Sequence, residues 1–177
     1  MTAPPLVRRF RPGDAAATHA VFFAAVRIGA AGHYRTQQLI DWAPSREIPQ
    51  GWGAWLDRNI TFIAETGGAV GGFFMLEPSG YLNMAFVRPE HRRSSMADLL
   101  YAAILAEARA RRMPVMTVWA SRLFHRFLAR RGWQIDPDPP PLAGHPIATE
   151  DAEPIDYAMK LVLADDHASP PRDAATP

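Results

Sequence analysis

The sequence contains no cysteine and no long uninterrupted apolar run. Without cysteine, the 177-residue chain cannot form a disulfide, a cysteine-based zinc site or a catalytic thiolate. No apolar stretch approaches the length of about 18 residues that a membrane-spanning helix needs, and residues 1–10 lack the apolar run of a secretory signal. These absences favour a soluble cytoplasmic protein with no membrane partner.

An excess of charge of one sign is also missing. The chain carries 19 basic and 18 acidic residues, which give a formal net charge of +1. This balance provides no overall attraction to nucleic acid, so any anion site has to be local. An arginine-bearing helix face over residues 121–131 is usually only solvated, and we expect no nucleic-acid partner. The six histidines show no metal-ligand spacing, so no metal site is predicted.

The chain has the length of one ordinary domain, and 48% of its residues are hydrophobic, enough for a well-packed core. Residues 1–164 are therefore expected to form a single domain. Residues 165–177 are rich in proline, aspartate and alanine and lack large apolar side chains. We expect them to form a disordered tail.

Apolar periodicity predicts an alternation of helices and strands. Strands are predicted at residues 6–10, 60–65, 69–76, 81–87, 114–119 and 155–163, and helices at 15–28, 36–42, 52–58, 96–111 and 121–131. Asp14, Thr36 and Ser121 are suited to cap the helices that follow them. The order predicts an α/β or α+β fold in which helices flank a mixed sheet, with a parallel crossover through residues 81–119.

The most informative stretch is residues 81–101, where a strand is followed by a polar loop and a helix. A helix N-terminus presents unpaired N–H groups and a partial positive charge, which together bind anions. The loop adds positive charge and hydroxyl donors through Arg92, Arg93, Ser94 and Ser95. These features suit a pyrophosphate, although the Gly-Lys pattern of a P-loop is absent. A purely structural alternative is a capping box from Ser95 to Asp98.

This loop resembles the signature of the GNAT superfamily of acetyl-CoA-dependent N-acyltransferases. The family motif, (Gln/Arg)-x-x-Gly-x-(Gly/Ala), opens a helix after a strand, and residues 92–97, Arg-Arg-Ser-Ser-Met-Ala, occupy that frame. Residues 87–91 match the family's valine-x-proline-glutamate-aromatic lead-in. The resemblance extends over residues 6–163, and residues 33–44 look like a small bacterial, YafP-like branch.

The resemblance implies a mixed, mostly antiparallel sheet of roughly six or seven strands, flanked by helices, whose central pair splays apart. The splayed strands would be residues 81–87 and 114–119, and the pantetheine arm of acetyl-CoA would lie between them. Backbone N–H groups of the 92–97 loop would hold the pyrophosphate. The cofactor-binding residues implied in this way are Phe86, Val87, Arg92, Arg93, Ser94, Ser95, Met96, Ala97, Ser121 and Phe124.

Two positions depart from the family pattern. Ser95 stands where the motif has glycine, which lets the backbone approach phosphate closely and tolerates positive φ. Leu128 stands where many members carry a general-acid tyrosine, four residues before the Gly132-Trp133 pair. A thiol with a pKa of about 8.5 leaves without strong acid help, so this loss costs at most a factor on the order of 10² to 10⁴.

The activity implied by the resemblance is transfer of an acetyl group from acetyl-CoA to a primary amine of a small molecule or a protein. Candidate catalytic residues are His33 and Tyr34, between the first helices, and Glu77, at a strand end. Histidine titrates near neutrality, so His33 can take a proton from an ammonium. An exposed loop histidine, a packing tyrosine and a turn carboxylate are the structural alternatives.

Trp42 and Asn83 are the candidate acceptor-binding residues, and Trp52 and Trp55 can extend an aromatic pocket wall. Tryptophans at helical spacing also serve the core, and an interior asparagine can be simply hydrogen-bonded. One alternative to an active enzyme of this kind stays open: the domain can be a catalytically silent CoA-binding module with a sensing or partner-binding role. The sequence does not fix the oligomeric state, but dimers are common in the family, and a homodimer is compatible with the resemblance.

Overall fold

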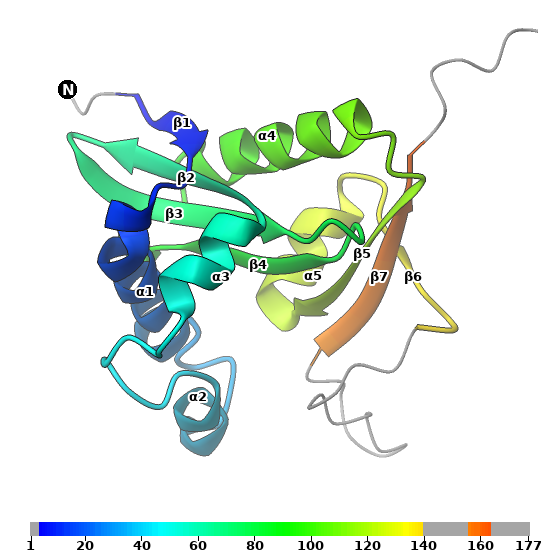
Figure 1. The fold of residues 1–177 in the computed structure, drawn as a ribbon. Helices are drawn as coiled ribbons and strands as arrows, with labels where there is room; N and C mark the ends of the chain where they lie inside the picture. The colour runs from blue at the N-terminus through cyan, green and yellow to red at the C-terminus, as the bar shows by residue number, and fades with distance from the viewer. Residues whose placement is uncertain (1–3, 140–155, 164–177) are drawn as a thin grey trace, which may run out of the picture.

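A computed structural model describes residues 4–139 and 156–163 (Figure 1). Its strands form two sheets. The first has the antiparallel order β1 (Leu6–Arg9), β2 (Ile60–Thr66), β3 (Ala69–Leu76) and β4 (Leu82–Val87). The second has the antiparallel order β5 (Val115–Ser121), β7 (Asp156–Val162) and β6 (Gln134–Ile135).

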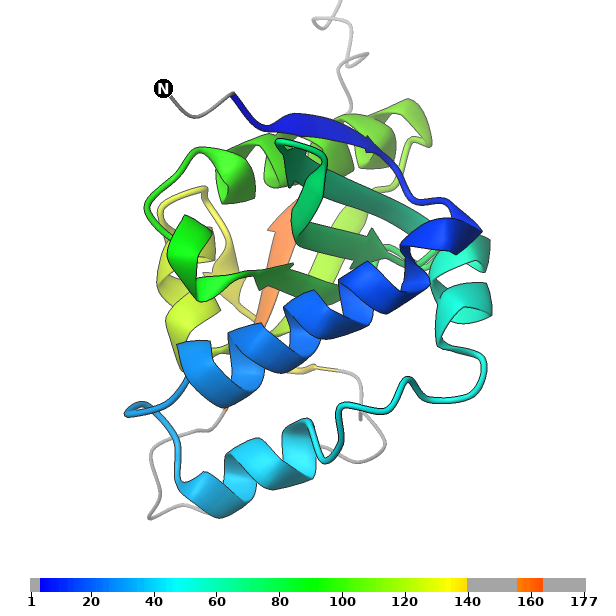
Figure 2. The same ribbon diagram turned by 90° about the vertical axis from the view of Figure 1, so that its left-hand side faces the viewer.

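The helices cover both faces of the first sheet. They are α1 (Ala15–Ala24), α2 (Thr36–Trp42), α3 (Trp52–Arg58), α4 (Met96–Ala110) and α5 (Arg122–Ala129). A π-helical segment, Ala25–Gly29, continues α1, and short 3₁₀ turns lie at Pro12–Asp14 and Pro89–His91. Helices α1 and α3 pack on one face of the sheet and α4 on the other, as Figures 1 and 2 show.

The side chains of strand β3 show why helices pack on both faces of the sheet. Phe73 and Met75 belong to the cluster that includes Leu56 of α3, whereas Phe74 belongs to the cluster that includes Leu100 of α4. Because successive side chains of a strand point to opposite faces, a strand covered on both sides needs a continuous apolar run. The run Gly-Gly-Phe-Phe-Met-Leu in β3 supplies it, and each of these residues is buried.

The two sheets meet at one point, between β4 and β5. A single parallel bridge joins Tyr81 to Thr117, and the Thr117 N–H donates to the carbonyl of Gly80 at 3.0 Å. A Cβ at Gly80 would lie 2.5 Å from the Val115 carbonyl oxygen, and its φ is +89°, so only glycine fits there. Beyond the bridge, the described residues form no further ladder between β4 and β5. The predicted splayed central pair and the parallel crossover are confirmed.

Most predicted elements agree with the structure to within two residues, but two of the three predicted helix caps are wrong. The Asp14 carboxylate makes no cap hydrogen bond for α1; it accepts from the Arg11 N–H at 2.8 Å. Thr36 is the first residue of α2, and Gln38 accepts from the Arg35 N–H instead. Ser121 does cap α5, because its hydroxyl accepts from the Phe124 N–H at 3.3 Å.

Within the described ranges, no helix is both long enough and apolar enough to cross a membrane.

The strand β6 and the two 3₁₀ turns were not predicted, since each is too short to show a period. The predicted tail, residues 165–177, and the predicted domain boundary at residue 164 lie outside the described residues.

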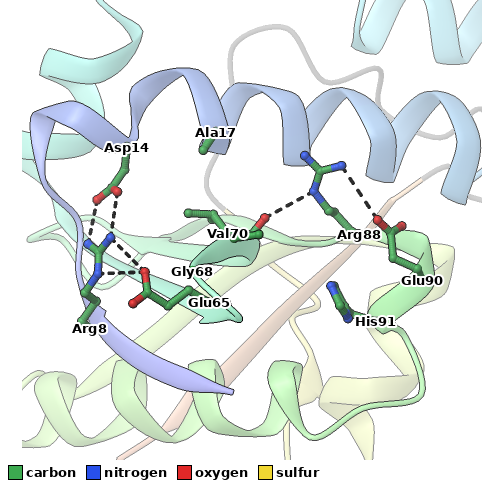
Figure 3. Close-up of a pocket in the computed structure, with 10 residues that line it drawn as sticks. Arg8, Asp14, Ala17, Glu65, Gly68, Val70, Arg88, Glu90 and His91 are labelled. Carbon is green, nitrogen blue, oxygen red and sulfur yellow. Dashed lines mark hydrogen bonds and ion pairs between the residues drawn. The ribbon is translucent and has the colours of Figure 1, made fainter. Parts of the chain in front are cut away.

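An ion cluster ties β1 to the start of α1 and to β2 (Figure 3). The Arg8 guanidinium donates to both oxygens of Asp14, at 2.8 and 2.9 Å, and to Glu65 at 3.1 Å. The hydrogen bonds from Arg8 are the main reason why the pKa of Asp14 is lowered, and the Arg11 N–H acts in the same direction. A carboxyl whose folded pKa is depressed stabilises the fold above its unfolded pKa of about 3.9.

We therefore expect Asp14→Ala to lower the free energy of unfolding by about 2 kcal/mol at pH 7, because it removes a charged, hydrogen-bonded group. The difference from wild type should shrink as pH falls toward and below 4, where Asp14 becomes protonated. Urea unfolding at several pH values measures this. Asp57→Ala, an exposed aspartate of α3, is the control, and a pH-independent loss in Asp14→Ala would contradict the account.

Candidate active site

A cleft of about 1170 Å³ opens beside the point where β4 and β5 part. Its lining comes from the α1–α3 region on one side and from strands β4, β5 and β7 on the other. The aromatic lining residues are Phe22, Tyr34, Trp42, Trp52, Trp55, Tyr81, Phe86 and Trp119. The polar lining residues include His19, Asp41, Glu47, Arg58, Asn83, Ser121 and Asp156. The predicted acceptor residues Trp42 and Asn83 therefore face one cleft.

Rings from the α1–α3 region and from β4 form a connected aromatic wall in the cleft. The Phe86 ring lies 5.0 Å from Phe22 and 6.1 Å from Trp42, and Phe22 lies 5.6 Å from Trp52. Trp52 is 6% exposed, and its indole N–H donates to Thr18 at 3.1 Å, so it serves the core as well as the wall. Trp52 thus packs in the core and also lines the cleft, while its contact with an acceptor stays a prediction.

The strand side of the cleft is polar. Asn83 is the extra residue of a bulge in β4, because Met75 pairs with Met84 while Leu76 pairs with Leu82. A bulge redirects a side chain, and the Asn83 amide here donates to the Glu77 carboxylate at 2.6 Å. The predicted catalytic residue Glu77 is therefore joined to the cleft through Asn83.

Two phenols of the cleft keep their protons. Burial, followed by the negative charge of Glu77, raises the pKa of Tyr81 to about 12. Burial is also the main cause that raises the pKa of Tyr34, and the charge of Asp156 acts in the same direction on both tyrosines. Asp156 stands opposite Ser121 in the pairing of β7 with β5, which brings its carboxylate to this end of the cleft.

Tyr34 fastens the loop after α1 to the start of α5. Its hydroxyl accepts from the Arg122 N–H at 2.9 Å, and its ring meets Trp42 at 5.8 Å. The predicted candidate Tyr34 thus lies in the cleft, close to Ser121. His33, its neighbour, is exposed and is not among the residues that line the cleft. The structure brings Tyr34, Glu77, Asn83 and Trp42 together and leaves His33 apart.

The loop before α4 presents free amides. The Ser94 hydroxyl donates to the His91 carbonyl at 2.7 Å and accepts from the Met96 N–H at 3.3 Å. Among the described residues, no protein acceptor is found for the N–H groups of Arg93, Ser95 and Ala97. The alternative capping box is wrong, since Ser95 makes no cap hydrogen bond and Asp98 pairs with Arg131. Unpaired N–H groups at the start of a helix are suited to bind an anion, and the anion-binding role of this corner stays a prediction.

The Arg92 side chain runs from the loop before α4 toward the π-helical segment that continues α1. Its guanidinium occupies the space beside Gly29, where a Cβ would lie 2.5 Å from a terminal nitrogen. Desolvation lowers the pKa of Arg92, although an arginine stays charged. Arg93 is exposed. Positive charge therefore flanks the free amides on the exposed side of the loop.

The two departures from the family motif have different structural consequences. Ser95 has φ −72°, so its backbone does not need the freedom of glycine. Leu128 is fully buried in the core cluster that includes Trp133, so no hydroxyl reaches the cleft from this position.

Four further predicted cofactor residues have different surroundings in the fold. Phe86 lines the cleft and Val87 packs on the α4 face of the sheet. Met96 is buried in the core, so only its backbone can face an anion, and Phe124 packs against Phe74 with ring centroids 5.7 Å apart. Their roles toward a cofactor stay predictions.

Several cleft residues were not singled out from the sequence, among them His19, Tyr81 and Asp156. His19 is 3% exposed, lies 5.3 Å from the Trp52 ring, and burial lowers its pKa. Its position in the apolar stripe of a predicted helix was an available signal. Asp156 had none, because its place depends on how β7 pairs with β5. Among the described residues no group of three or more metal-ligating side chains gathers, and the predicted absence of a metal stays a prediction.

The structure combines a parted strand pair, a helix start with unpaired N–H groups and an aromatic cleft, and the comparisons identify the class of domain. Residues 31–141 match the model of the acetyltransferase (GNAT) domain. The uncharacterized N-acetyltransferase YafP of Escherichia coli K12 is 30% identical over 128 residues, which cover 72% of this chain and 80% of YafP. The chain belongs to the GNAT family and is an N-acetyltransferase.

Solved structures support the same fold. A GCN5-related N-acetyltransferase from Rhodopseudomonas palustris is 26% identical, with a TM-score of 0.77 over 92% of this chain and 98% of the other. The PaiA N-acetyltransferase of Thermoplasma acidophilum, solved with coenzyme A, has a TM-score of 0.69 at 13% identity, over 91% of this chain and all of the other. The fold prediction, including its likeness to YafP, is confirmed.

Tyr34→Phe tests the contact that holds the cleft's outer loop. Removing the hydroxyl leaves the partly buried Arg122 N–H without this acceptor, which should lower the free energy of unfolding by about 1 kcal/mol. Urea unfolding measures the loss, and amide NMR shifts should move most at residues 121–124. Tyr157→Phe on β7 is the control, and an unchanged stability and spectrum in Tyr34→Phe would contradict the contact.

Proposed function

We propose that this N-acetyltransferase takes its acetyl group from acetyl-CoA and transfers it to a primary amine of a small molecule or a protein, by direct attack on the thioester. The observation that carries the proposal is the pair of facing edge strands, β4 and β5, which part beside a loop with free amides. Unpaired strand edges need hydrogen-bond partners, and an extended arm that contains amides supplies them.

The residues of this chain fit such a donor in three places. The N–H groups of Arg93, Ser95 and Ala97, with the charge of Arg92, suit the pyrophosphate. The backbone edges of β4 and β5 suit the pantetheine amides. Ser121 and Asn83, which line the cleft, place the thioester between the arm's channel and the aromatic wall. The solved relatives from Thermoplasma acidophilum and Salmonella typhimurium, which bind CoA and acetyl-CoA, support this choice of donor.

The transfer requires a neutral amine, a stabilised oxyanion and a departing thiolate. The amine nitrogen bonds to the carbonyl carbon, the C–S bond breaks, and the sulfur leaves with its electron pair and takes a proton. Tyr34 and Tyr81 stay protonated at neutral pH and can donate that proton in place of the hydroxyl that Leu128 lacks. The amine's own proton passes to the carboxylates beside the cleft, Glu77 and Asp156.

We do not propose that this protein binds nucleic acid. Arg131, one of the arginines on the predicted basic face of α5, pairs with Asp98 and lies 3.4 Å from the Phe127 ring centroid. It is therefore committed within the fold. A homodimer and a cytoplasmic location remain predictions.

The direct test joins calorimetry with thiol release. We expect acetyl-CoA to bind the pure protein and free thiol to appear when a panel of primary amines is added. Binding without release from any amine would support the silent CoA-binding domain instead, and no heat with either CoA or acetyl-CoA would overturn the proposal.

Ser95→Asp separates helix capping from anion binding. Aspartate at an N-cap beside a helix N-terminus stabilises the helix, so the melting temperature should rise or stay equal. The added carboxylate repels a pyrophosphate, so the dissociation constant for CoA should rise at least about tenfold. Calorimetry measures both wild type and variant, with Ser95→Asn as the neutral control. Equal CoA affinity in all three proteins would remove the pyrophosphate from this corner.

A further inference from the structure

The cleft has an aromatic wall and a set of carboxylates, and together they describe a ligand. Phe22, Trp42 and Trp52 of the helices and Phe86 of β4 form the wall, with neighbouring ring centroids 5.0 to 6.1 Å apart. Trp42 is 38% exposed even though it meets two other rings. Covering such a ring removes apolar surface from water, which favours a ligand with a flat apolar body.

Among the described residues that line the cleft, acidic groups outnumber basic ones. They include three carboxylates, Asp41, Glu47 and Asp156, and one guanidinium, Arg58, while the Arg122 guanidinium lies 5.9 Å from the Tyr34 ring centroid. The remaining titratable base, His19, is kept neutral because burial lowers its pKa. The whole chain has a net charge of +1, so this excess of acid is local. A cation is favoured in the cleft and an anion is disfavoured.

The carboxylates are not equally placed. Asp41 and Glu47 are exposed residues of α2 and of the segment after it. Asp156 is half-buried at the strand side, opposite Ser121, and its charge acts on both Tyr34 and Tyr81. That is the side on which the proposed thioester lies, so an amine ready to react has its nitrogen near Asp156.

We propose that the acceptor is a cationic arylalkylamine whose ammonium pairs with Asp156 and whose ring lies against the aromatic wall of Phe22, Trp42, Trp52 and Phe86. The inference rests on the proposed function, since it names the acceptor of the same site. An amine that also carries a carboxylate meets repulsion, and a polyamine leaves the rings uncovered.

Four probes in the thiol-release assay isolate the two features. Tryptamine has both the ring and the cation, tryptophan adds a carboxylate, n-butylamine lacks the ring, and spermidine replaces the ring with charges. We expect kcat/KM for tryptamine to exceed that of each other probe by at least about tenfold. Thiol release without this preference would overturn the inference and leave the proposed function standing. Acetyl-CoA binding with no thiol release from any of the four probes would also overturn the inference, whereas a protein that binds neither CoA nor acetyl-CoA would overturn both.

Asp156→Asn tests the ammonium partner. We expect KM for tryptamine to rise at least about fivefold while KM for acetyl-CoA stays equal, because one charge pair is lost at the acceptor side only. The preference for tryptamine over tryptophan should fall to below about threefold, a change that loss of folded protein cannot produce. Asp57→Asn, exposed on α3 and outside the cleft, is the control. An unchanged preference in Asp156→Asn would remove Asp156 from ammonium binding.

Discussion

The parallel bridge between Tyr81 and Thr117 fixes where the two sheets touch and therefore where they part. Gly80 makes the contact possible, because any side chain there would collide with the Val115 carbonyl. Beyond the bridge, β4 and β5 carry edges that the described residues do not pair. Each chain segment that follows one of these strands, the 92–97 loop after β4 and α5 after β5, starts a helix at the open end. The proposed channel for the acetyl donor and the proposed anion site thus both follow from the place where the two sheets part.

The acceptor side depends on a different part of the fold. Helix α1 crosses the face of the sheet opposite α4 (Figure 2). Trp42 of α2 lies 6.1 Å from the Phe86 ring of β4, and Tyr34 lies 5.8 Å from Trp42. The hydrogen bond from the Arg122 N–H to Tyr34 joins this region to α5. Phe86 takes part in both sides, since its ring is in the wall and its backbone lies on the β4 edge. Donor and acceptor sites therefore share one strand.

The order of helices and strands was predictable because periodicity and glycine turns are local. The bounds of α3 and β3 agree residue for residue with the prediction, where Trp52, Leu56 and the β3 run give strong patterns. The caps of α1 and α2 were not predictable in the same way. Asp14 could cap a helix by its type, but Arg8 and Glu65, the latter far along the chain, recruit it into an ion cluster.

The site was predictable only in part, for the same reason. The 92–97 corner is contiguous in sequence, so its motif carried the anion site. Trp42, Glu77 and Asn83 were suggested by type and place; Trp42 and Asn83 line one cleft, and Glu77 accepts a hydrogen bond from Asn83 beside it. Asp156 and Tyr81 reach the cleft through strand pairing, which no local pattern encodes. His33 had the suitable chemistry, but the turn at Ala30 leaves it exposed.

Hydrogen exchange with and without acetyl-CoA tests most directly whether the parted strands receive the donor's arm. At saturating acetyl-CoA, peptides that cover residues 82–87, 92–97 and 115–121 should exchange more slowly, while β1 and β2 stay unchanged. Saturable binding with no added protection along either β4 or β5 would contradict the account, because the arm would then lie elsewhere.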